Sequence, residues 1–213
     1  MDKGKLLETV KKLKQEKRKF SQAIELVVTL KSIDLKKENV NFFITLPHRV
    51  REKKICLFSE KSILGGEKIF NRVVTKDQFS SLDKKESKKL AHDNDFFVSQ
   101  APVMASVAAS FGRMLGPLGK MPSPAIGSVV TKLDDSSLHE LVERLNRTVH
   151  LRTLKNDTSL KLAVGNQSMS EEHIVENILA TEDGIITGLP KGAENIKGFV
   201  LKTTMGKPTK LNL

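Results

Sequence analysis

Apolar and polar residues alternate along the chain with two different periods, and the change of period separates its segments. Leu6, Val10 and Leu13 have the spacing of one helix face. The basic residues that follow them suit the negative end of a helix dipole. Residues 22–31 then alternate at every second position, which predicts a strand with one buried and one open face. A second strand is predicted over 40–46.

The pattern is different between residues 50 and 147. Short apolar runs predict buried strands at 54–59, 73–74 and 95–99. Helical spacing predicts helices near 79–90, from Pro102 through Met114, and over 134–147. Strands that alternate with helices favour a small parallel sheet. Three Gly and three Pro between Leu115 and Gly127 predict a loop.

Alternation at every second residue returns after residue 148. It predicts strands over 149–153, 160–164 and 197–205. Between the last two strands, Ser170 is a helix N-cap followed by two glutamates in the first turn.

Half-exposed strands therefore occur at both chain ends, and a parallel-sheet pattern lies between them. The simplest fold is an α+β domain built from both chain ends, residues 1–49 and 148–213. A Rossmann-like, three-layer α/β domain, residues 50–147, is inserted into it. Two chain crossings then form the hinge.

The charge balance favours an anionic partner. The chain has 36 Lys and Arg against 25 Asp and Glu, a net charge of +11. The discontinuous domain carries +7 of this excess and the inserted domain +4. The alternative is a basic surface that only keeps the protein soluble.

Several other classes are disfavoured by composition. One cysteine, Cys56, excludes a disulfide framework and a thiolate zinc site within one chain. No apolar run is long enough to cross a membrane, and the N-terminus lacks the apolar core of a signal peptide. We therefore expect a cytoplasmic protein with no membrane partner.

The glycine-rich segment 112–120 raises the question of nucleotide binding. A P-loop would need Gly at the position of Met114 and a hydroxyl at the position of Met121, so the match fails. Two interpretations stay open. The segment is a stiff connection, or the amide of Gly119 and the ammonium of Lys120 contact a polynucleotide phosphate as a secondary RNA site.

No catalytic or metal motif is present in the sequence. None of the five histidines has metal-ligand spacing, and no local Ser-His-Asp or Cys-His set occurs. We expect no enzyme activity, no metal and no cofactor. The competing hypothesis is an enzyme that binds a nucleotide or small molecule in the inserted domain.

The C-terminal segment combines side chains that suit RNA. Thr203 and Thr204 offer hydroxyls to a ribose, Met205 can pack on a sugar or base, and Gly206 permits close backbone approach. The alternative is an ordinary strand end followed by a turn.

The first strand and its entry offer further candidates. Phe20 either stacks on a base or anchors the core at a strand edge. Glu25 and Lys31 lie on the open strand face and are either contacts or simply solvated.

Five segments carry a family resemblance over nearly the whole chain. They are LPH at 46–48, GPLGKMP at 116–122, ELVERLNRTV at 140–149, VGN at 164–166 and TTMG at 203–206. Together they resemble the large-subunit ribosomal protein L-one family in its archaeal-type form. The resemblance implies a discontinuous domain with a Rossmann-like insertion, and a protein that is monomeric when free.

The resemblance also implies partners and contacts. The expected partners are the stalk region of large-subunit rRNA, exit-site tRNA whose release is assisted, and the protein's own mRNA, whose translation is repressed. A non-ribosomal assembly-factor relative is a further alternative, although such relatives usually carry long basic extensions. The implied RNA contacts are Phe20, Glu25, Gly165, Thr204, Met205 and Gly206.

The sequence departs from the family pattern in three places. Leu118 stands where the family usually has Arg, residues 49–52 replace a Gly-containing hinge, and Lys207 precedes the usual Pro.

Overall fold

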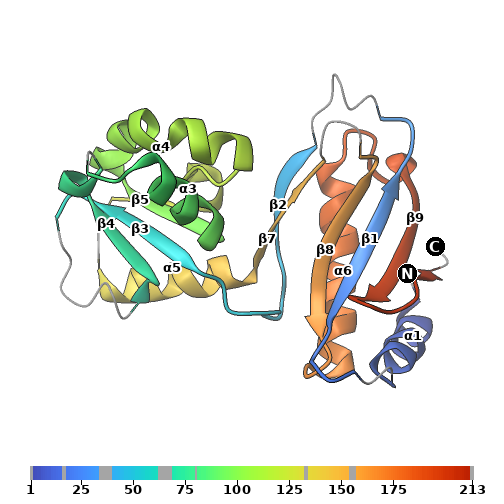
Figure 1. Ribbon diagram of the computed structural model, residues 1–213. Helices are drawn as coiled ribbons and strands as arrows, with labels where there is room; N and C mark the ends of the chain where they lie inside the picture. The colour runs from blue at the N-terminus through green and yellow to red at the C-terminus, as the bar shows by residue number, and fades with distance from the viewer. Residues whose placement is uncertain are drawn as a thin grey trace. The chain divides into compact units, whose positions relative to one another are not determined.

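The computed structural model describes residues 2–15, 18–33, 40–61, 69–79, 81–131, 134–153 and 157–211. The chain divides into two compact units (Figure 1). We call Met1–Arg51 with Arg147–Leu213 the composite unit, and Glu52–Asn146 the inserted unit. The boundaries expected from the sequence fall beside these divisions. That each unit folds as an independent domain stays a prediction.

The composite unit is built on a four-stranded antiparallel sheet. Its strand order is β10-β9-β1-β8. The bounds are Ala23–Leu30 for β1, Ser159–Asn166 for β8, Ile196–Thr203 for β9 and Thr209–Leu211 for β10. The two chain ends thus meet in one sheet, because β1 pairs with strands from near the C-terminus. The strand β10 is too short to produce a recognisable period in the sequence.

One face of this sheet is covered by two helices. The alternating side chains Ile24, Leu26 and Val28 are fully buried. They belong to one core with the apolar stripe of α1 (Lys3–Gln15) and the inner face of α6 (Glu171–Gly188). The intervening positions of β1 are all partly exposed. The predicted open face is therefore present on β1.

A separate ribbon carries the chain out of the composite unit and back. Its strands are β2 (Asn41–Thr45) and β7 (Thr148–Arg152), which pair antiparallel. The ribbon packs on α6 where Gly184 and Gly188 lie. A Cβ at either glycine would come within 2.8 Å of Ile44 or Phe42, respectively. Both glycines are needed for this close approach, despite their low helix propensity.

The inserted unit contains the expected parallel sheet, with strand order β4-β3-β5-β6. The strands are β3 (Ile55–Ser59), β4 (Arg72–Thr75), β5 (Phe96–Gln100) and β6 (Val129–Val130). Helices α3 (Lys84–Asp93) and α4 (Met104–Leu118) lie on one side and α5 (Asp135–Arg147) on the other (Figure 1). Four packed phenylalanines fill the core between the sheet and α3 and α4: Phe58, Phe79, Phe97 and Phe111.

Two helix boundaries differ from those predicted. The helix expected to end at Met114 continues to Leu118, so the first residues of the predicted loop form its last turn. Pro117 is accepted there, and Gly119 ends the helix at a φ of 67°. The helix expected near residue 79 begins only at Lys84, and Phe79 instead follows a short 3-10 helix, Lys76–Gln78, and packs in the aromatic core.

None of the helices in the described residues is long and apolar enough to cross a membrane. The described residues also contain no cluster of three or more His, Cys, Asp or Glu suited to a metal ion. Burial raises the pKa of Cys56 to about 12, so its thiol is protonated at neutral pH.

Candidate nucleic-acid interface

Three segments that are distant in the sequence meet at one end of the composite sheet. They are the start of β1, the end of β8 and the end of β9. Gln22, which is buried, joins them. Its backbone N–H donates to Oε1 of Gln167 at 3.0 Å, and its own Oε1 accepts from the N–H of Met205 at 3.0 Å. A residue beside β1 therefore fixes the turns after the other two strands.

Two large apolar side chains are exposed at this end of the sheet. Phe20 is 54% exposed and Met205 is 64% exposed, and no other large apolar side chain of the described residues is classed as exposed. Phe20 stands two residues before Gln22, and Met205 is bonded to Gln22. These two side chains are the candidates for apolar contact with a partner at this end of the sheet.

The neighbouring threonines face opposite ways. Thr203 is fully buried, so its side chain does not lie on the surface where a direct RNA contact was expected. Thr204 is exposed. Its hydroxyl donates to the carbonyl of Ala23 at 3.3 Å, which leaves the oxygen lone pairs to accept from a ligand. The N–H of Gly206 closes the turn on the Thr203 carbonyl at 3.1 Å.

The open face of the sheet beside this end is rich in cations. Glu25 pairs in register with Lys202, and their Nζ and Oε2 atoms are 3.7 Å apart. Val27 of β1 pairs in register with Lys161 of β8 on one side and with Val200 of β9 on the other. Val200 in turn pairs with Lys210 of β10. Hydrogen bonds from Ser159 and Lys161 lower the pKa of Asp157, which keeps it ionised beside Lys161. The face therefore carries three lysines and two carboxylates, and Lys161 and Lys202 each form an ion pair there.

Two other predicted contacts, Gly165 and Lys31, are not part of the exposed surface at this end of the sheet. Gly165 is buried, and a Cβ there would lie 2.7 Å from Cγ1 of Ile174, so the glycine lets β8 approach α6. Lys31 follows the opposite end of β1, where its N–H donates to Asn195. Lys31 thus lies beyond the far end of β1, a strand length of roughly 25 Å from the end where Gln22 and Met205 lie.

The predicted secondary contact in the inserted unit is already occupied by protein groups. The ammonium of Lys120 donates to the carbonyls of Ala91 at 2.8 Å and Asn94 at 2.6 Å, which caps the C-terminus of α3. The amides of Gly119 and Lys120 donate to the carbonyls of Gly116 and Leu115 at the end of α4. These groups stabilise two helix ends, and the expected phosphate contact is not supported.

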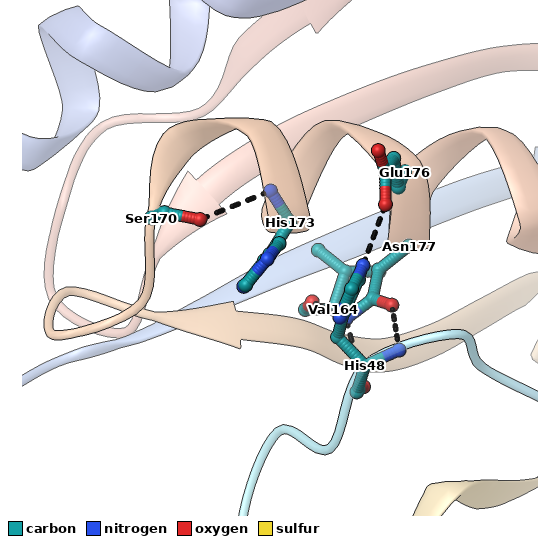
Figure 2. Close-up of polar contacts among 6 residues, drawn as sticks. All are labelled: His48, Val164, Ser170, His173, Glu176 and Asn177. Atoms are coloured by element: carbon teal, nitrogen blue, oxygen red, sulfur yellow. Dashed lines mark hydrogen bonds and ion pairs between the residues drawn. The ribbon is translucent and has the colours of Figure 1, made fainter.

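The segment after β2 is held against α6 by a polar cluster (Figure 2). The fully buried Asn177 accepts from the N–H of His48 and donates to its carbonyl. The same amide donates to the carbonyl of Val164 on β8. The His48 ring stacks on His173 and is hydrogen-bonded to Glu176. That hydrogen bond lowers the pKa of Glu176.

The end of β8 joins this cluster to the interface. Asn166 pairs in register with Ala23, and its side-chain amide donates to the carbonyl of Val50 at 2.9 Å. The chain is therefore fixed to the composite unit as far as residue 50.

Sequence reasoning missed Gln22, Gln167, Lys202 and Asn166. A polar residue at the first position of the predicted alternating strand was the available signal for Gln22. The other three become apparent only through strand register.

The chain was compared with known protein families and proteins. A family model described as "Ribosomal protein L1p/L10e family" matches residues 10–207. A relative from Nanoarchaeum equitans is 37% identical over 209 residues, covering 94% of this chain and 96% of the relative. One from Thermococcus kodakarensis is 34% identical over 218 residues, covering 99% and 98%. Both relatives are named large ribosomal subunit protein uL1.

Proposed function

The chain belongs to the ribosomal protein L1p/L10e family, and from this premise we propose that it is a structural component of the large ribosomal subunit that binds ribosomal RNA. The related proteins are ribosomal proteins and not enzymes, so the nucleotide-binding enzyme is set aside. One observation carries the choice of binding surface. Phe20, two residues before Gln22, and Met205, whose backbone N–H donates to Gln22, are both exposed beside an open sheet face that carries three lysines.

Each part of this surface has a distinct task in RNA binding. Lys161, Lys202 and Lys210 neutralise phosphates, which supplies affinity without sequence information. Phe20 and Met205 pack on unstacked bases or sugars. The Thr204 oxygen accepts from a ribose 2′-hydroxyl, a group that DNA lacks. Gly165 and Thr203 shape the surface from beneath.

The finer proposal names the RNA. The bound segment is the stalk region of large-subunit rRNA beside the exit site, where the protein assists release of deacylated tRNA. The same surface binds a similar structure in the protein's own mRNA and represses its translation, since two similar hairpins compete for one surface. The family resemblance supports these roles, and the ribosome in the cytoplasm is the corresponding location.

The proposal is tested by crosslinking the protein to RNA in cells and sequencing the attached RNA. Recovery of the rRNA stalk region supports the ribosomal role, and recovery of the protein's own mRNA supports repression. Recovery of rRNA precursors alone would indicate an assembly factor. Recovery of no defined RNA would contradict RNA binding altogether.

The protein should prefer a structured RNA stem-loop to DNA of the same sequence, because ribose hydroxyls contribute to binding. If roughly 4–6 phosphates are neutralised, log K should fall with log salt with a slope of about −3 to −5. Fluorescence titrations over a series of salt concentrations measure both quantities. Equal affinity for the DNA version would show that the hydroxyls do not matter.

The composite unit should fold alone and keep most of the rRNA affinity. The backbone N–H of Lys53 donates to Oδ1 of Asn146 at 3.0 Å, so the two cut points lie close together and a short Gly-Ser linker can join residues 1–51 to 147–213. The inserted unit, residues 52–146, should fold but bind the stem-loop weakly. Circular dichroism and titration of both fragments test this division. Tight, specific binding by the inserted unit would show that the interface is wrongly assigned.

A further inference from the structure

Helix α3 of the inserted unit presents a basic face that the proposed rRNA surface does not use. At 100° per residue, four lysines and one histidine fall within an arc of about 140°. They are Lys84, Lys85, Lys88, Lys89 and His92, and all are exposed. The buried side of the helix is formed by Ser87, Leu90 and Ala91. We call the first five residues the α3 basic face.

The lysines of this face lack anionic partners within the described part of the chain. No ion pair or hydrogen bond joins any of the four ammonium groups to another described residue. Glu86 and Asp93 lie outside the arc, three residues before and four residues after Lys89, and neither forms an ion pair with it. The face is thus a continuous set of lysines without an ion pair to any described residue.

This arrangement opposes the stability of the helix. Lys84 and Lys88 are four residues apart, as are Lys85 and Lys89, and like charges at that spacing repel. Two of the lysines also occupy the first turn, where the helix dipole disfavours cations. A sequence that breaks local rules without a gain inside the fold indicates a functional surface.

The helix is firmly held in spite of this repulsion. Lys120 caps its C-terminus through the carbonyls of Ala91 and Asn94, and the Asn94 side chain donates to the carbonyl of Leu90 at 2.9 Å. Leu90 and Ala91 belong to the core beneath. The basic face is therefore a rigid element and not a mobile tail.

We propose that the α3 basic face is a second RNA-binding surface, which holds the phosphate backbone of an RNA helix without reading its sequence. RNA as the partner rests on the proposed function. The face consists of four ammonium groups and one imidazole, so charge for phosphates predominates over groups for base contacts. Lys84 and Lys89 are about 8 Å apart along the helix axis, a length over which a duplex presents several phosphate charges. The chain can then hold two RNA segments on two surfaces.

The test uses the full chain and a 20-base-pair RNA duplex that lacks the stalk sequence. The variant K85Q/K88Q/K89Q removes three charges from the face. Its salt slope for the duplex should be about 2 to 3 smaller in magnitude than that of the unaltered protein. Its affinity for the rRNA stem-loop should stay within twofold. The matched control K54Q/K61Q/K76Q removes three exposed lysines near other strands of the same unit, and should retain duplex binding.

Further variants separate this proposal from the proposed function. F20A/M205A should lose stem-loop binding but keep duplex binding. A failure of the proposed rRNA surface can therefore be distinguished from a failure of the α3 basic face. K85R/K88R/K89R should bind the duplex normally, which distinguishes charge from disturbance of the helix. The glutamine variant should melt at the same or a higher temperature, because repulsion is relieved.

Two results would contradict the proposal that the α3 basic face binds RNA. One is a loss of duplex binding that is equal in the glutamine variant and its matched control. The other is unchanged duplex binding with a selective loss of binding to a polyglutamate peptide, which would assign the face to an acidic protein partner.

Discussion

Replacing Phe20 and Met205 together by alanine should weaken binding to the rRNA stem-loop by roughly 30- to 1,000-fold. Stacking of a base on an aromatic ring contributes about 1–3 kcal/mol, and the thioether contact adds up to about 1.5 kcal/mol. The combined loss of about 2–4 kcal/mol gives this range of affinity. Titration of the full chain against the stem-loop at fixed salt measures it.

Thermal unfolding provides the first control for this variant. Both side chains are exposed, so their removal should shift the melting temperature by no more than a degree or two. The conservative variant Phe20→Trp keeps a stacking surface and should retain affinity within a few fold. If F20A/M205A binds within twofold of the unaltered protein, these side chains are not contacts. Phe20 would then be only an exposed residue at a strand edge.

The alternating pattern of β1 was a reliable guide because its physical cause is local. Ile24, Leu26 and Val28 point to one side of a strand whatever that strand pairs with, and all three are buried. The same period implied that Glu25 lies on the open face, as the structure shows. The open face of β1 could therefore be predicted before any pairing was known.

The composition of the interface depends on pairing and was beyond the sequence pattern. Lys31 and Glu25 have similar positions in the alternation, but they lie toward opposite ends of β1, and only the end near Glu25 meets the turns after β8 and β9. Gln22 acts through bonds to Gln167 and Met205, residues 145 and 183 positions away. Such bonds leave no local periodic signal.

The glycine-rich segment of the inserted unit was misjudged for a related reason. Gly and Pro favour loops, yet Pro117 falls in the last turn of α4, and Gly119 is the left-handed residue that ends the helix. The position of Lys120 after Gly119 is compatible with phosphate binding, but its ammonium donates to the carbonyl groups at the end of α3. A lysine after a glycine is ambiguous between these roles, and only tertiary contacts decide.

The valine variant of Thr204 isolates one atom of the interface. Valine keeps the branched shape and the strand preference but removes the hydroxyl. That hydroxyl donates to the carbonyl of Ala23, so it faces RNA as an acceptor. Loss of a hydrogen bond in a desolvated contact costs about 1–3 kcal/mol, which predicts a loss of roughly 5- to 150-fold in affinity. Thr204→Ser, which keeps the hydroxyl, should lose much less.

The neighbouring threonine and the DNA ligand complete this experiment. Thr203→Val alters a fully buried residue, so it should change the melting temperature while affinity stays within about twofold. Thr204→Val should hardly change the affinity for the DNA version of the stem-loop, because DNA lacks the 2′-hydroxyl that would donate to Thr204. The RNA preference of the protein should therefore fall by the same factor as its RNA affinity. An equal loss on RNA and DNA would instead mean that Thr204 acts through its bond to Ala23 and supports the turn. Thr204 would then belong with Thr203 among the residues that shape the surface without touching RNA.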